Sequence, residues 1–164
     1  MPQVEFRAMP ATARVWVFGA AAPVTGAARD TLLQAVDEHL QRWKAHGAPL
    51  VCARDWREDH FLAVAVDEAA TGASGCSIDG LFRALDRLEP MLGTSMIDSA
   101  AVFWRASDGS VQSAARPDFR RAAARGEVNA TTPVFDTTVN TVGDWRERFE
   151  RPVAQSWHAR LAGG

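Results

Sequence analysis

The sequence has little cysteine and no long hydrophobic run. Its 164 residues include two cysteines, Cys52 and Cys76, and a domain of this size buries enough apolar surface to fold without a disulfide. Because Cys52 falls in a strand-like run, we expect both thiols to be reduced. No apolar stretch approaches the roughly 18 residues of a membrane-spanning helix, and the N-terminus lacks the pattern of a signal peptide. These absences predict a soluble, cytoplasmic protein with no membrane partner.

Neither sign of charge is in large excess. The sequence has 18 Lys and Arg residues and 20 Asp and Glu residues, so the net charge is −2 and the isoelectric point is near 6.1. Nucleic-acid-binding proteins normally carry a basic excess or stripe, so we expect no nucleic-acid partner. A hydrophobic fraction of 47% with 23% charged residues is typical of a globular domain. One domain over residues 1–164 is therefore predicted.

The hydrophobic periodicity predicts the order strand, helix, strand, strand, helix, strand. Strands are expected at 14–18, 50–56, 61–66 and 100–105, with helices from about 27 to 46 and from 77 to 88. This is the order of the ferredoxin-like split βαβ fold, which belongs to the α+β class. The first and third strands are the most apolar, as expected of the central strands in that core over 13–106. Residues 107–164 should form a hairpin and a mixed, partly helical extension packed on the core.

A glycine-rich connection before the second helix is the strongest candidate for a functional site. The connection runs from Asp67 to Gly75, longer than the two to six residues usual before a helix, and Cys76 follows at the helix start. A thiol there feels the partial positive charge of unpaired backbone N–H groups, which favours the thiolate. Glycine also lets a ligand approach the backbone closely. We predict a small-molecule or anion site centred on Cys76, with ligand-binding residues Gly72, Ser74, Gly75, Ser77 and Asp79.

A purely structural role for this loop is the alternative. Cysteine is among the most buried residue types, and Ser77 or Asp79 is suited to cap the helix. Several familiar signatures are missing. A nucleotide-binding P-loop needs a lysine after its second glycine, a phosphatase loop needs an arginine where Phe82 stands, and no C-x-x-C pair exists for disulfide exchange. The sequence pattern therefore predicts where a functional site lies but does not indicate which reaction, if any, takes place there.

A nucleophilic cysteine usually works with a histidine, and the chain offers four. In the expected topology, His46 lies at the opposite sheet edge from Cys76. His39 falls among exposed helical positions, and His60 falls at a turn. His158, in the C-terminal extension, is the remaining candidate base, so the predicted catalytic pair is Cys76 and His158. The spacing of His and Cys residues indicates no metal site, and we predict no cofactor.

Several segments resemble a family of small bacterial proteins with no assigned activity. The most specific block is Gly75-Cys76-Ser77-Ile78-Asp79, a Gly-Cys-Ser-Ile-Asp motif, and further likeness lies at 43–47, 65–68, 134–136 and 156–158. Members of this family are often labelled ABC transporter ATPases. The Walker A loop, the signature motif and the domain length of such an ATPase are all missing here, so we do not expect that activity.

Two functions remain open from the sequence. One is a ligand site at the Cys76 loop, whether or not the protein is an enzyme. The other is a non-catalytic interaction protein, for example a homodimer that uses an exposed sheet face or edge. Trp56 and Trp104, expected on edge strands, suit such a contact.

Overall fold

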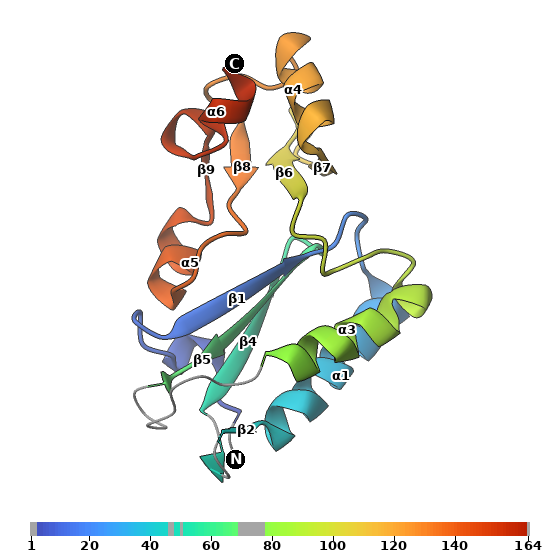
Figure 1. Cartoon of the computed structure of the whole chain (residues 1–164), viewed down its shortest axis with the longest axis vertical. Coiled ribbons are helices and arrows are strands. Elements are labelled where there is room, and N and C mark those ends of the chain that lie inside the picture. The colour runs from blue at the N-terminus through green and yellow to red at the C-terminus, as the bar shows by residue number, and fades with distance from the viewer. Residues whose placement is uncertain (1–2, 46–47, 50, 69–77, 164) are drawn as a thin grey trace.

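The computed structural model describes residues 3–45, 48–49, 51–68 and 78–163. The chain is an α+β protein with antiparallel sheets, as predicted (Figure 1). The first sheet has the order β1-β5-β4, the second β7-β6-β8-β9, and β2 and β3 form a small ribbon. The strands span β1 (Arg14–Gly19), β2 (Lys44–Ala45), β3 (Ala48–Pro49), β4 (Cys52–Arg57), β5 (Phe61–Val66), β6 (Ala101–Arg105), β7 (Val111–Ala115), β8 (Pro133–Phe135) and β9 (Glu150–Pro152).

The helices lie largely where the periodicity predicts them. The helix α3 continues past its expected end near 88 and through Pro90 to Leu92, and it is capped by Gly93, whose φ of 73° is in the left-handed conformation that glycine favours. The helices span η1 (Phe6–Ala8), α1 (Gly26–Arg42), α3 (Asp79–Leu92), α4 (Arg116–Ala124), α5 (Val142–Arg148), η2 (Val153–Gln155) and α6 (Ala159–Ala162).

The first sheet is built around β5. All six residues of this strand are fully buried apolar side chains, as expected of a strand covered on both faces. On one face, α1 and α3 pack side by side (Figure 1). Their buried residues, among them Leu32, Leu40 and Leu85, form one hydrophobic cluster with Phe18 and Leu62 of the sheet. This part of the fold follows directly from the apolar periodicity.

The fourth predicted strand does not join the first sheet. The strand β6 pairs with β7 on one side and with β8 on the other, both in the second sheet. The β6–β7 hairpin closes through a turn with Gly109 at φ 86°, and β8 occupies the other edge of β6. Both partners are nearer to β6 in the sequence than β1 is, so pairing with them costs less loop-closure entropy. The ferredoxin-like core is therefore not confirmed, and β1 is an edge strand rather than a central one.

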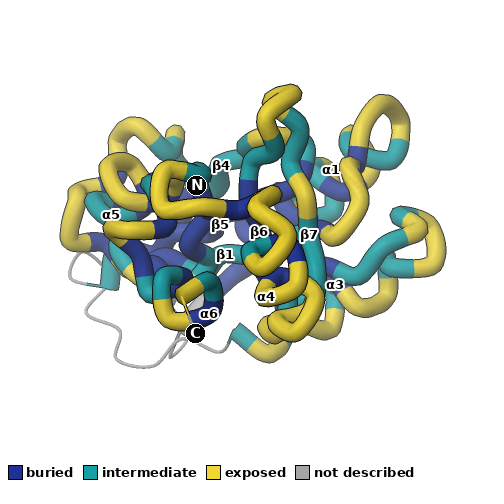
Figure 2. Tube along the Cα trace, turned by 90° about the horizontal axis from the view of Figure 1, so that it is seen from above, coloured by how far each residue is buried: buried dark blue, intermediate teal, exposed yellow. Residues whose placement is uncertain are grey.

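The two sheets share a buried core. Phe61 of β5 lies with its ring centroid 4.9 Å from those of Phe103, Phe135 and Phe149, which belong to the second half of the chain. Figure 2 shows buried segments from both halves meeting in the interior. Trp145 of α5 is fully buried in the same cluster. The C-terminal extension is thus joined to the first sheet by aromatic packing.

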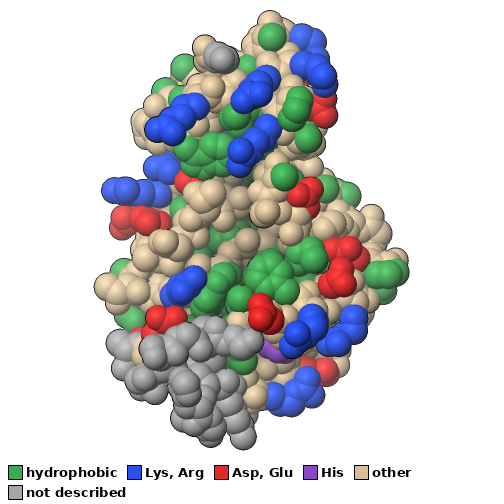
Figure 3. Space-filling model, in the orientation of Figure 1, with side chains coloured by type: hydrophobic (Ala, Val, Ile, Leu, Met, Phe, Trp, Pro, Cys, Tyr) green, Lys and Arg blue, Asp and Glu red, His purple; other side chains and the backbone are tan. Residues whose placement is uncertain are grey.

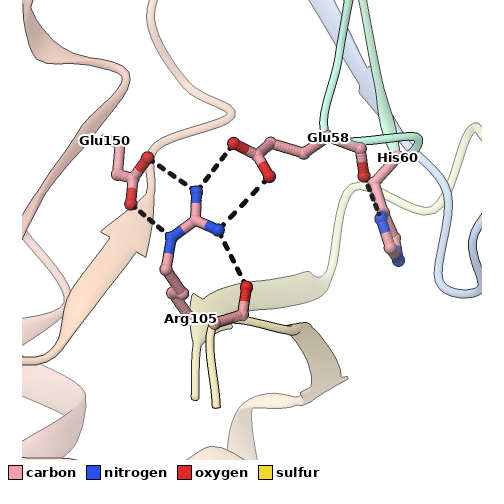
Figure 4. Close-up of polar contacts among 5 residues, drawn as sticks. Glu58, His60, Arg105 and Glu150 are labelled. Carbon is pink, nitrogen blue, oxygen red and sulfur yellow. Dashed lines mark hydrogen bonds and ion pairs between the residues drawn. The ribbon is translucent and has the colours of Figure 1, made fainter. Parts of the chain in front are cut away.

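A cluster of charged side chains bridges the same junction at its surface. The guanidinium of Arg105 donates to Glu150 at 2.7 Å and to Glu58 at 2.7 Å, so it connects β6, β9 and the β4–β5 turn (Figure 4). The hydrogen bonds that Arg105 donates, chiefly the one to Glu150 and then the one to Glu58, raise the pKa of Arg105 above its ordinary value. Backbone hydrogen bonding ties the same turn to the start of the loop after β1, since Ala20 N–H donates to the His60 carbonyl.

Candidate ligand-binding cleft

The outer edge of β1 has backbone groups that point away from the sheet. In an antiparallel ladder, alternate residues direct their N–H and C=O groups toward the partner strand. Ala20 N–H bonds to His60 of the β5 side, whereas Val15 N–H bonds to Asn140 on the other side. The alternation therefore turns the N–H and C=O groups of Val17 and Gly19 outward, away from β5.

Only the first part of this outer edge is paired. An antiparallel bridge joins Arg14 to Thr141, with Val15 N–H donating to Asn140 C=O at 2.9 Å and Val142 N–H donating to Ala13 C=O at 2.9 Å. Farther along the strand, the residues that the structure describes offer the outward N–H groups of Val17 and Gly19 no hydrogen-bond partner. We call these two residues the free edge of β1.

A cleft of about 270 Å³ lies against the free edge. Its walls are the connection 96–99 between α3 and β6 and the connection 137–140 between β8 and α5. Figure 3 shows hydrophobic side chains gathered on this face between the second sheet and α3. The apolar lining comes from several elements and includes Val17, Phe18, Phe82, Met96, Ile97, Phe103 and Val139. A sheet edge and a partly apolar hollow thus coincide.

The cleft is bounded at both ends along the direction of β1. At one end the Asn140 carbonyl already accepts the outward N–H of Val15. At the other, β1 itself ends at Gly19, and the Phe103 ring packs on the face of this residue, where an added Cβ would sit 2.6 Å from the ring. Gly19 is therefore required by this close approach. The hollow between these two ends follows the strand for only a few residues.

The rim of the cleft carries one cation and one carboxylate. The guanidinium of Arg14 lies 4.6 Å from the centre of the Trp16 ring, a cation–π contact. The carboxylate of Asp98 accepts a hydrogen bond from Ala100 N–H at 2.9 Å. Both side chains are exposed, and neither forms an ion pair with another described residue.

A buried carboxylate fixes the 137–140 wall. Asp136 is 3% exposed and accepts hydrogen bonds from Thr138 N–H at 2.9 Å, from Trp157 Nε1 at 3.0 Å and from Arg151 at 2.7 Å. Burial alone pushes the pKa of Asp136 upward, but these hydrogen bonds outweigh it and hold the pKa below its ordinary value. The charged form therefore anchors the turn that lines the cleft.

The predicted base His158 lies in the C-terminal region. Its Nδ1 is 2.6 Å from the Ser156 hydroxyl, and its ring stacks on Trp157 with centroids 3.9 Å apart. Burial lowers the pKa of His158 to about 4. Figure 1 places α6, which His158 precedes, at the opposite end of the molecule from the start of α3. The structure therefore does not bring His158 together with Asp79.

Most of the predicted Cys76 loop lies outside the described residues. This applies to Gly72, Ser74, Gly75, Cys76 and Ser77. Asp79, also predicted to bind ligand, is the exposed first residue of α3, where its negative charge interacts favourably with the helix dipole.

The histidine beside the start of α3 is His39. A Cβ on Gly80 would lie 3.2 Å from its ring, and its Nε2 is buried with no hydrogen-bond partner among the described residues. Burial, with Arg42 and Arg87 nearby, lowers the pKa of His39.

The other candidate surfaces are largely covered. Trp104 is 8% exposed and packs against Phe119 with ring centroids 5.3 Å apart, so it does not offer the surface contact expected of it. Trp56 is half-buried against the first hydrophobic cluster. Cys52 is buried, with its sulfur 3.5 Å from the Leu40 carbonyl oxygen. Within the described residues, no three His, Cys, Asp or Glu side chains are placed to hold a metal ion.

Fold and site together define an α+β protein with a cleft beside an edge strand. In comparison with known proteins, no family model, no curated protein and no solved structure matches the chain. In the part of the chain that the structure describes, no helix is long and apolar enough to cross a membrane.

Proposed function

We propose that this protein binds a short, extended peptide along the free edge of β1. The observation that carries the proposal is the coincidence of unpaired backbone groups at Val17 and Gly19 with a partly apolar cleft of about 270 Å³. Outward N–H and C=O groups of an edge strand are the template on which an added strand forms hydrogen bonds. This is a binding function, without a catalytic step.

The geometry limits the ligand to a few residues. A strand rises about 3.3 Å per residue, so the outward groups from Val15 to Gly19 extend over about 13 Å. The pairing of Val15 with Asn140 and the end of β1 at Gly19 bound this length. A segment of two to four residues fits the span.

The lining favours apolar side chains on the ligand. Successive side chains of an added strand point to opposite sides. On one side they meet Phe18, Phe82 and Met96, and on the other they meet Val17 and Val139. Phe82, a large hydrophobic residue that is 36% exposed, gains burial when a ligand covers it, which supports binding at this site.

The test removes one backbone donor from the free edge. Proline lacks an N–H and is tolerated on edge strands where that group points to solvent, so Val17→Pro removes the outward donor while leaving the ladder to β5 intact. The probe is the tripeptide Leu-Leu-Leu, measured by titration calorimetry. Wild-type protein should bind it, and Val17→Pro should bind at least tenfold more weakly.

A matched control is Val111→Pro. Val111 begins the edge strand β7 and also has an outward N–H, because Ala106 N–H bonds to the preceding residue, Ser110. It does not line the cleft, so this variant should bind Leu-Leu-Leu as the wild type does. Equal binding by Val17→Pro and wild type, or no binding of the tripeptide by wild-type protein, would show that the proposal is wrong.

As a second candidate function, we propose that Cys76 is a reactive thiol whose neighbouring base is His39 rather than His158. The observation that favours it is the partnerless Nε2 of His39 beside the start of α3. Cys76 precedes Asp79 by three residues, and so its Cα lies within about 11 Å of that residue's Cα. The rate of iodoacetamide labelling of Cys76 against pH tests this. His39→Gln should move the profile to higher pH and His158→Gln should not; identical profiles in all three proteins would contradict it.

A further inference from the structure

The two charges at the cleft rim point to the chemical form of the ligand. Building on the peptide-binding function proposed above, we infer that the cleft recognises both ends of a free, zwitterionic short peptide, with Arg14 binding its carboxylate and Asp98 binding its ammonium group. The peptide lies antiparallel to β1. The ligands of the cleft are therefore free di- to tetrapeptides with apolar side chains, rather than internal segments of a folded protein.

The first step of the argument is that Arg14 and Asp98 stand at opposite ends of the cleft. Arg14 is the first residue of β1. The chain before Asp98 is held near the other end, because Thr94 Oγ1 accepts a hydrogen bond from Ala22 N–H at 3.2 Å. The chain after it returns to the same end, because Phe103 lies against Gly19. Figure 1 shows the α3–β6 connection passing over that end of β1.

The second step is polarity. A peptide antiparallel to β1 has its C-terminus at the start of β1 and its N-terminus at the end of β1. Its carboxylate then lies near the guanidinium of Arg14, and its ammonium group lies near the carboxylate of Asp98. A parallel peptide would place like charges together at both ends, which is unfavourable. The segment that already pairs with β1, at Thr141, is also antiparallel.

The third step is that an internal segment cannot continue past the cleft along β1. Asn140 already accepts the outward N–H of Val15 at one end, and at the other end β1 stops at Gly19. An internal segment of a longer chain has to leave the cleft at both ends, whereas a free peptide begins and ends within the cleft. Neither rim charge forms an ion pair with another described residue, so each is available to a ligand terminus. Guanidinium and carboxylate form strong, charge-assisted hydrogen bonds in such a pairing.

The experiment compares three forms of one peptide by titration calorimetry: Leu-Leu-Leu with free ends, with an acetylated N-terminus, and with an amidated C-terminus. Wild-type protein should lose about tenfold in affinity with either blocked end, which corresponds to about 1.4 kcal/mol. Arg14→Gln should bind the free and amidated forms equally but still discriminate against acetylation. Asp98→Asn should show the converse pattern.

Matched controls are Arg120→Gln and Asp86→Asn, which neutralise exposed residues away from the cleft. Both should keep the wild-type discrimination between the three peptides. Equal affinity for all three forms, with binding still lost in Val17→Pro, would overturn recognition of the termini and leave peptide binding standing. Discrimination against acetylation that disappears in Arg14→Gln would overturn the antiparallel orientation. Absence of binding for every form would overturn both proposals.

Discussion

The two sheets are stabilised by different chemistry. The first sheet has six-residue strands in full register, and all six residues of its central strand β5 are buried and apolar. In the second sheet, β8 and β9 have only three residues each, and the buried polar side chains Asp136, Ser156 and His158 lie beside them. Hydrophobic packing accounts for the first sheet, whereas the second combines a hydrophobic cluster around Trp104, Phe119 and Val134 with hydrogen-bonded polar groups. Short strands bury too little surface to be fixed by packing alone.

The largest expected effect tests whether the two regions are separable at all. Phe61 of β5 contacts three aromatic rings of the second half, so Phe61→Ala should remove about 3–5 kcal/mol of unfolding free energy. Because the core is shared, unfolding should remain a single transition by circular dichroism and by tryptophan fluorescence. Phe82→Ala, at a residue 36% exposed, should cost about 1 kcal/mol. Two separate transitions in the Phe61 variant would show that the halves fold independently.

A somewhat smaller loss is expected when the polar network of the second region is broken. Asp136→Asn removes the charge that pairs with Arg151 and holds Thr138. Leaving a partly buried guanidinium without its counter-ion should cost about 2–4 kcal/mol of unfolding free energy, measured by urea denaturation. Asp118→Asn, which breaks an exposed ion pair with Arg121, should cost less than about 1 kcal/mol. Similar losses in the two variants would contradict the contrast between the regions.

The sequence predicts the first region well because its signals are local. Apolar residues at helical spacing between Leu32 and Leu40 place α1, and the all-apolar run from Phe61 to Val66 places β5. It also predicts the β6–β7 hairpin from the turn at Gly109. What it does not predict is the partner of β6, because strand pairing depends on which distant edge is available. That single difference turns β1 from a central strand into the edge strand beside the cleft.

The cleft itself leaves only faint signals in the sequence. The threonine-rich stretch around Asp136 and Asn140 is visible, but a turn at the sheet edge is its simplest interpretation. The actual role of Asp136 requires Trp157 and Arg151, which are 21 and 15 residues away. Contacts of this kind between distant residues have no periodicity to reveal them. The rim charges Arg14 and Asp98 likewise become meaningful only once the 96–99 connection is known to border β1.

The pH dependence of stability should also separate the two regions. Burial lowers the pKa of His158 in the second region to about 4 from an unfolded value of 6.5, so unfolding takes up a proton below pH 6.5. Stability is therefore full above pH 6.5, falls by about 2–3 kcal/mol as the pH drops to 4, and levels off below that.

The pH prediction is checked by urea denaturation between pH 4 and pH 8. His158→Gln should lower stability at pH 7 through loss of the Ser156 contact, but its stability should change less with pH between 6.5 and 4. His39, whose pKa is also lowered by burial, contributes further slope in that interval, so the double variant with His39→Gln should change least with pH between 6.5 and 5, above the range in which unfolded carboxylates titrate. An unchanged slope in His158→Gln would show that this histidine does not control the dependence.

The smallest expected effect concerns the surface contact that links the regions. Arg105 holds both Glu58 and Glu150 through its planar guanidinium, a geometry that lysine cannot reproduce. Arg105→Lys should cost about 1 kcal/mol of unfolding free energy, less at high salt because these side chains are partly exposed. Arg125→Lys, at a single exposed pair with Glu127, should have no measurable effect.

The Arg105 contact bears on function because Glu58 belongs to the first sheet and Glu150 to the second (Figure 4). A double-mutant cycle between Arg105→Lys and Glu58→Gln measures how strongly the turn and β6 are coupled. Phe103 belongs to β6, and its ring packs on Gly19 beside the cleft, so loosening β6 should weaken binding of Leu-Leu-Leu more than it weakens the fold. Loss of stability with unchanged affinity would instead mean that the cleft is held by the aromatic core alone.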